Sequence, residues 1–284
     1  MDLIIQLLIM ASIVAMMISL GSQISFQALI QLQAQRALVL RSLLGTSVLL
    51  PLIGAGLLAL AVPFLEPPAK VAIALMVVCP SAPLAQLRAA KAGGNHLLAV
   101  RIQLSAAIAA IVTVPVFVYA YTATFGASVW TLSPLTVAIQ VLGVQVLPVL
   151  LGMLWKSLSP TTATRLHPWV VAIAQGMVIV LSLLILLKVS PLIWQFFRGN
   201  GVALITMLVL IALSLGLGQR LAGRDTTHQT TVAVVTAMRN PGLALLLAHQ
   251  DPSLAIPSVT IGILSYLLLT LIGVTLYQVW HHER

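Results

Sequence analysis

The chain has 284 residues, of which 60% are hydrophobic and only 7% are charged. An average soluble domain carries about 25% charged residues, and 14 basic plus 5 acidic side chains cannot cover a water-facing surface. The composition therefore excludes soluble enzymes, and the scattered basic residues exclude a nucleic-acid partner. The single Cys79 excludes a disulfide framework, and we expect neither a metal site nor a cofactor. This is the composition of an integral membrane protein.

Apolar runs divide the chain into segments of membrane-spanning length, about 20 residues each. The first has no basic region before it and no small-residue cleavage motif, so we expect it to stay as a span. We predict an all-α polytopic membrane protein with a single domain, 1–284. Its nine predicted spans, cut at proline, glycine and charged residues, are 3–20, 37–62, 69–90, 96–122, 133–155, 168–190, 201–219, 230–248 and 257–280.

The distribution of basic residues predicts the orientation. The opposite side of the membrane would hold three basic residues, Lys70, Lys188 and Arg198. The loops after the odd-numbered spans, with the C-terminus, hold ten: Arg36, Arg41, Arg88, Lys91, Arg101, Lys156, Arg165, Arg220, Arg224 and Arg284. Because basic loops stay in the cytoplasm, we predict an outer N-terminus and an inner C-terminus, in a bacterial inner membrane. Segment 21–36, rich in glutamine, is predicted to lie along the membrane interface.

Two of the predicted spans contain helix-breaking residues at their centres. Cys79, Pro80, Ser81 and Pro83 interrupt the third span, and the run Arg239-Asn240-Pro241-Gly242 interrupts the eighth. Backbone groups freed at membrane depth require protein or a water-filled cavity around them. Paired interruptions in the two halves indicate a transporter with an inverted repeat, here about 1–122 and 133–280. We interpret Pro51, Pro115, Pro148 and Pro191 as ordinary kinks or helix ends.

Arg239 is the most informative single residue, because a guanidinium at the bilayer centre costs at least about 2.5–3.5 kcal/mol and needs partners. The acidic residues all fall in predicted loops or termini: Asp2, Glu66, Asp225, Asp251 and Glu283. Two interpretations remain open. The guanidinium either ties the broken helices together, through freed carbonyls, Gln86 or Gln103, or it binds an anionic substrate with its planar fork.

The sequence around both interruptions resembles the bile acid:sodium symporter family. CPSA at 79–82 resembles the family's first broken helix, RNPGLA at 239–244 the second, and MISLGSQISFQAL at 17–29 an early conserved stretch. The resemblance implies two helix bundles, called panel and core, with the broken helices crossing in the core. With nine predicted spans, the chain is also similar to the nine-helix members of that family. Auxin-efflux-type carriers, which have a similar fold, are the alternative among transporters.

Departures from the family pattern fall on the implied sodium ligands. Most of the positions that carry oxygen ligands in the family hold other side chains here: Ala85, Ala99, Val235 and Arg239, whereas Gln86, Gln103 and Asn240 keep a side-chain oxygen. Because a cation site with arginine in it repels sodium, we predict that the Arg239 guanidinium replaces the sodium ion.

We therefore predict a sodium-independent secondary transporter of a small organic anion, with Arg239, Asn240, Gln86 and Gln103 at the substrate site. Gln140, Gln145 and Gln175 are candidates for further polar lining. His96 and His249, at span ends, are weak candidates for proton coupling. A non-transporting membrane sensor or an ordinary sodium symporter are the alternatives. The predicted partners are the anion and the lipid bilayer, and the sequence leaves the oligomeric state open.

Overall fold

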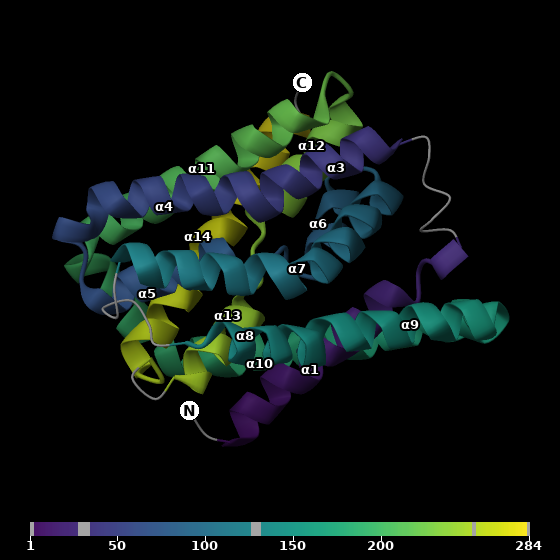
Figure 1. The fold of residues 1–284 in the computed structure, drawn as a ribbon, viewed down its shortest axis with the longest axis horizontal. Coiled ribbons are helices and arrows are strands. Elements are labelled where there is room, and N and C mark those ends of the chain that lie inside the picture. Colours follow the sequence, from purple (N-terminus) through teal and green to yellow (C-terminus); the bar gives the residue numbers. More distant parts are fainter. Residues whose placement is uncertain (1–2, 28–34, 126–131, 252–253, 283–284) are drawn as a thin grey trace.

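The computed structural model describes residues 3–27, 35–125, 132–251 and 254–282. These residues form helices joined by short connections, without a β-strand (Figure 1), so the all-helical prediction is confirmed. Six of the described helices are long and apolar enough to cross a membrane, and Leu7–Gly21 and Pro67–Val78 are shorter apolar helices. The count of nine spans and the inverted repeat stay predictions. Residues 28–34 of the predicted interfacial segment lie outside the described residues.

The helices follow the predicted segments closely. Their bounds are α1 (Leu3–Gly21), α3 (Arg36–Leu44), α4 (Leu50–Ala61), α5 (Pro67–Val78), α6 (Ala85–Lys91), α7 (His96–Phe125), α8 (Pro134–Val141), α9 (Leu147–Leu158), α10 (Pro160–Gly199), α11 (Gly201–Ala222), α12 (Thr226–Ala237), α13 (Pro241–Gln250) and α14 (Pro257–His282). The bounds of α10 differ most from the prediction of 168–190. Hydropathy marks only the apolar part of a helix, and the polar first turns of α10 extend it toward the N-terminus.

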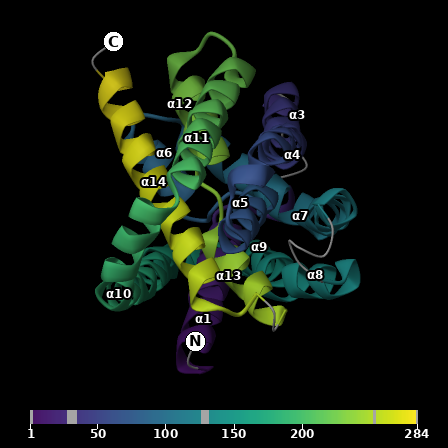
Figure 2. The same cartoon turned by 90° about the vertical axis from the view of Figure 1, so that its left-hand side faces the viewer.

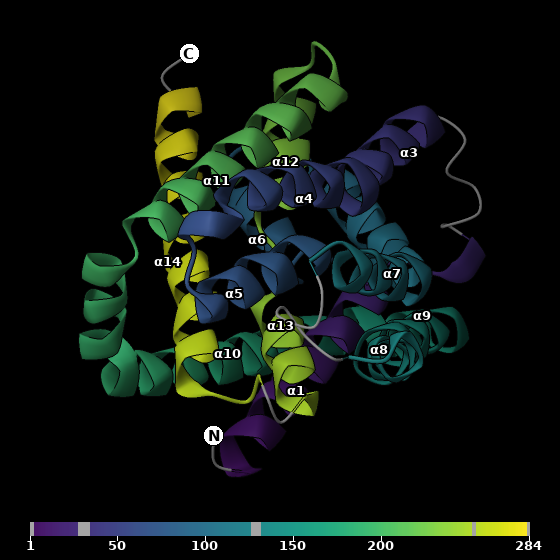
Figure 3. The ribbon, with the colours of Figure 1, turned by 60° about the vertical axis from the view of Figure 1, so that its left-hand side comes forward.

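Pro51, Pro115, Pro148 and Pro191, which the sequence predicted to be kinks or helix ends, lie within continuous helical segments. A π-helical turn, η2 (Gly45–Leu49), joins α3 to α4, and a second, η4 (Leu142–Val146), joins α8 to α9. One leucine and then a proline, Pro51 or Pro148, follow each turn. Proline has no N–H to donate and crowds the preceding turn, and a π turn accommodates this without ending the helix. Pro191 lies inside α10, which turns near its C-terminal end in Figure 3.

The helices pack as two groups. The panel bundle consists of α1, α8–η4–α9 and α10, and α1 packs along both α9 and α10. The core bundle consists of α3–η2–α4, α5, α6, α7, α11, α12, α13 and α14. Figure 1 shows the panel along the lower edge and α3, α4, α11 and α12 along the upper edge, and Figure 2 shows the same separation from the side. The bundles meet most extensively where α7 packs against α8, and also where α1 contacts α13 and α10 contacts α14.

Glycine permits the close approach of α1 and α9 in the panel bundle. A Cβ atom on Gly21 would lie 2.1 Å from the Val149 carbonyl oxygen, and one on Gly152 would lie 2.2 Å from the Ile18 carbonyl oxygen. Because lipid offers no hydrophobic driving force between helices, close backbone packing through small residues is how membrane helices associate. The panel bundle is therefore held by backbone contact at both glycines.

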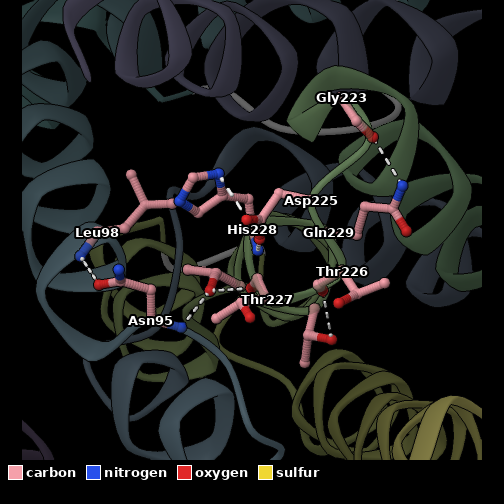
Figure 4. Close-up of polar contacts among 10 residues, drawn as sticks. Asn95, Leu98, Gly223, Asp225, Thr226, Thr227, His228 and Gln229 are labelled. Carbon is pink, nitrogen blue, oxygen red and sulfur yellow. Dashed lines mark hydrogen bonds and ion pairs between the residues drawn. The ribbon is translucent and has the colours of Figure 1, made fainter. Parts of the chain in front are cut away.

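Side-chain caps fix the ends of the core helices around the α11–α12 connection (Figure 4). The Asp225 carboxylate accepts from the His228 N–H at 2.8 Å and caps α12, and the Asn95 side chain accepts from the Leu98 N–H at 2.9 Å at the start of α7. The Asn95 N–H donates to the Thr231 hydroxyl at 2.7 Å. These bonds satisfy helix N–H groups that have no partner within the helix, and they link α7 to α12.

Candidate functional site

The two interruptions cross each other at the centre of the core bundle. The first break (Cys79–Leu84) separates α5 from α6, and the second break (Met238–Asn240) separates α12 from α13. The Asn240 N–H donates to the Pro80 carbonyl at 2.9 Å, and the Ala82 N–H donates to the Met238 carbonyl at 2.8 Å. These bonds form an antiparallel bridge between Ser81 and Arg239. The freed backbone groups of each break thus find partners in the other, as burial in a membrane requires.

The Arg239 guanidinium is buried beside this crossing, with 1% of the residue exposed. Nη2 donates to the Val77 carbonyl at 2.7 Å, Nη1 to the Thr46 carbonyl at 3.0 Å, and Nε to the Met76 carbonyl at 3.4 Å. Met76 and Val77 belong to the last turn of α5, where carbonyls lack helical partners and the helix dipole favours a cation. Thr46 lies in η2, and its hydroxyl is 3.0 Å from that of Thr236. Arg239 therefore joins three segments of the core.

Asn240 ends the second break and begins α13. Its side-chain oxygen accepts from the Leu243 N–H at 3.1 Å and so caps the helix. Its Nδ2 atom is buried and has no hydrogen-bond partner among the described residues. Because a buried donor without a partner costs free energy, this amide group is suited to donate to a bound ligand.

The two predicted glutamines lie behind the first break. Gln103 of α7 donates through Nε2 to the Ala82 carbonyl and, at 3.4 Å, to the Ser81 hydroxyl. The Gln86 side-chain oxygen accepts from Gln23 Nε2 at 3.1 Å, which joins α6 to the end of α1 in the panel bundle. A second glutamine pair, in which Gln250 Nε2 donates to Gln140 Oε1, joins α13 to α8. Each half-helix that follows a break is thus hydrogen-bonded to the panel bundle.

A cavity of about 510 Å³ lies between the two bundles at the crossing. Its wall is formed by α1 and α10 of the panel bundle and by both breaks, α6, α13 and α14 of the core bundle. This volume is within the range of small-molecule sites, about 300–1,000 Å³. The lining contains five of the ten residues singled out from the sequence: Pro83, Arg239, Asn240, Pro241 and Gly242.

The other predicted site residues lie close by without lining this cavity. Cys79, Pro80, Ser81, Gln86 and Gln103 are buried in the packing behind the breaks. Of the additional glutamines, Gln175 lines the cavity, whereas Gln145 is buried in η4 with no partner for its amide atoms among the described residues. Ala85, Ala99 and Val235, the positions that the resemblance assigns to sodium ligands, are fully buried in the structure.

Several contributors to the site have no signal in the sequence. The partners of Arg239 are backbone carbonyls, which every residue possesses, so no residue type points to Thr46, Met76 or Val77. The only indication was the proline after η2, which is associated with a local change of helical hydrogen bonding. Arg88 and Lys91 were counted as topology signals, yet both line the cavity.

Comparison with known proteins agrees with this architecture. The model of the Sodium Bile acid symporter family matches residues 10–197, more than half of the chain. The match includes the first break and ends before the second, so Arg239 and Asn240 lie outside it. A search of curated proteins finds no significant match. The resemblance inferred from the motifs is confirmed: the chain belongs to the sodium bile acid symporter family, a family of membrane transporters rather than enzymes.

Proposed function

We propose that the protein moves a small organic anion across the membrane by alternating access and does so without sodium. Family membership supports transport, and the cavity between two bundles at crossing broken helices is typical of the central site of a secondary transporter. In this proposal the panel and core bundles move against each other, and residues 1–122 and 133–280 form the two halves of an inverted repeat.

The contacts of Arg239 carry the proposed sodium independence. Three carbonyl oxygens surround the guanidinium, and oxygen atoms are the ligands that hard cations prefer. Arginine remains charged in proteins, so this position already holds a permanent cation. A sodium ion about 5 Å away would be repelled by about 3 kcal/mol at an effective dielectric constant of 20. The guanidinium therefore takes the structural role of a bound ion.

The cavity lining supports an anionic substrate. It contains three basic residues, Arg88, Lys91 and Arg239, and no aspartate or glutamate among the described residues. The unpaired Asn240 Nδ2 atom and the N-terminus of α13, both at the cavity, are groups that interact favourably with negative charge. We keep Arg239, Asn240, Gln86 and Gln103 as the proposed substrate site. In it, Arg239 contributes long-range positive charge, Gln103 holds the first break in place, and Gln86 joins α6 to Gln23.

The proposal includes a bacterial inner-membrane location with the N-terminus outside and the C-terminus inside. Ten basic residues against three, counted over the helix ends and the connections between them, support this orientation. C-terminal fusions to a reporter that folds only in the cytoplasm and to one active only in the periplasm test it. Activity of the periplasmic reporter alone would reverse the orientation.

Thermal stability of the purified protein against a panel of organic anions, in matched sodium and choline buffers, tests the function. We expect a stabilising anion to act equally in both buffers. The decisive variant is Arg239→Gln, which removes the built-in cation and leaves the carbonyls free. It should be less stable in choline and gain stability from sodium, whereas Arg239→Lys, which keeps the charge, should show no sodium effect.

Each result of these measurements identifies one of the alternative functions. An anion that stabilises the unaltered protein only in sodium would identify an ordinary sodium symporter. Absence of any effect from anions, together with no uptake by proteoliposomes, would identify a membrane sensor or a relative that no longer transports. An anion-dependent uptake that ignores sodium would support the proposal.

A further inference from the structure

One edge of the cavity carries two basic side chains on successive turns of α6. Arg88 and Lys91 are three residues apart, so they share one face of the helix, and both line the cavity. Arg88 is half-buried and Lys91 is exposed. Neither side chain forms a hydrogen bond or ion pair with another described residue, although the Arg88 backbone carbonyl accepts from Gln278. Both positive charges are therefore free to bind a ligand.

The third basic residue of the lining is not free in this way. The Arg239 guanidinium points into the core bundle, where its three nitrogen atoms donate to the carbonyls of Met76, Val77 and Thr46. A ligand that used this guanidinium directly would have to displace those bonds and leave buried carbonyls without partners. The charges that can meet a ligand without this cost are Arg88 and Lys91.

The walls formed by α1 and α14 carry regularly spaced apolar side chains. Ile9, Ile13 and Met16 line the cavity from α1, and Leu264, Leu268 and Leu271 line it from α14. Both sets follow the spacing i, i+4, i+7, so each forms a stripe along one helix face. Two apolar stripes on different helices and a cationic edge on a third provide separate surfaces for two chemically different parts of one molecule.

We propose that Arg88 and Lys91 bind the acidic group of an amphipathic organic anion, whose apolar body lies between the stripes of α1 and α14. This inference rests on the proposed function and assigns the selection for charge to α6 rather than to Arg239. A guanidinium beside an ammonium suits a group with several acceptor oxygens, such as a sulfonate or carboxylate. The stripes of α1 and α14 select for the size of the anion's apolar body.

Binding of two matched pairs of probes tests the assignment. The probes are naphthalene-2-sulfonate and pyrene-1-sulfonate, each beside its neutral sulfonamide, measured by titration calorimetry on protein in phosphatidylcholine nanodiscs. We expect the sulfonates to bind more tightly than the sulfonamides. Arg88→Gln and Lys91→Gln should each weaken sulfonate binding about tenfold, and the double variant should bind each sulfonate no better than its sulfonamide. The control, Arg224→Gln, removes an exposed cation outside the cavity lining and should change nothing.

The outcomes distinguish this inference from the proposed function. If the double variant binds the sulfonates as tightly as the unaltered protein, the assignment to α6 is wrong while anion binding stands. If the unaltered protein binds neither sulfonate better than its sulfonamide, this inference fails, and the proposed function fails with it only if the panel of organic anions is also without effect. Repeating the titration in phosphatidylglycerol nanodiscs separates the two sources of an anionic group. Loss of sulfonate binding there would show that lipid phosphate, rather than a free anion, occupies the pair, which would overturn a substrate role.

Discussion

The two breaks cross at one point, and each contributes different groups to the pairing of the backbone atoms that the interruptions free. The first break is six residues long and contains two prolines, and it contributes mainly backbone carbonyls, as does the turn of α5 before it. The second break is three residues long and contributes functional side chains: Arg239 donates to the carbonyls, and the Asn240 side-chain oxygen accepts from the Leu243 N–H at the start of α13. Figure 1 shows the second break as an extended stretch between α12 above and α13 below.

This difference shows how interrupted helices can persist in a membrane. Proline removes donors, so a proline-rich break accumulates acceptors that have no partner. A second break that carries a guanidinium supplies N–H donors and a positive charge at the same depth. The two segments therefore satisfy each other, and disturbing them should have unequal effects: removing a donor from the second break should cost more than removing a contact to the first.

The largest effect is expected from Arg239→Met, which keeps the volume and removes the donors to three buried carbonyls. We expect a loss of about 3 kcal/mol or more, because hydrogen bonds to charged groups contribute about 1.5–3 kcal/mol each and unpaired carbonyls cost further free energy. Thermal unfolding in detergent measures it. The stability of Arg239→Lys should lie between that of Arg239→Met and that of the unaltered protein, since an ammonium group lacks the planar fork. If Arg239→Met were as stable as the unaltered protein, the hydrogen bonds of Arg239 would not stabilise the core bundle.

A smaller effect is expected from Asn240→Ala at the other end of the second break. The variant removes the acceptor for the Leu243 N–H and should cost about 1 kcal/mol, the usual value of an N-cap. Asn240→Ser, which retains a capping oxygen, is the matched control and should recover most of the loss. Hydrogen exchange of the Leu243 amide reports the same change locally. Equal protection in the Ala variant would show that the cap does not stabilise α13.

The smallest effect is expected from Gln103→Leu, next to the first break. The variant removes the donor to the Ala82 carbonyl, but it also removes the buried Oε1 atom, which has no partner among the described residues. These contributions oppose each other, so we expect a change of less than about 1 kcal/mol in thermal unfolding. If Gln103→Leu lost as much stability as Arg239→Met, the two breaks would not differ in their contribution to stability.

Much of the fold follows from the sequence alone, because the bilayer restricts the choices. Apolar runs of membrane length must become helices, and clustered prolines must interrupt them. Both breaks were predicted from Pro80, Pro83 and Pro241, and the structure confirms that the helices end there. The resemblance to the family came from both breaks and the stretch 17–29, and the family match over residues 10–197 includes the first break. Hydropathy was less informative where polar residues extend a helix, as at the start of α10.

The sequence also determined that Arg239 is buried in an apolar span without a carboxylate partner in any span. Only the tertiary structure identified the hydrogen-bond partners of this residue. Its partners are carbonyls of α5 and η2, which are 162, 163 and 193 positions away in the chain. Backbone acceptors are the same for every residue type, so no pattern of side chains can identify them. Which acceptors lack a partner depends on where helices end and cross, and packing alone determines that.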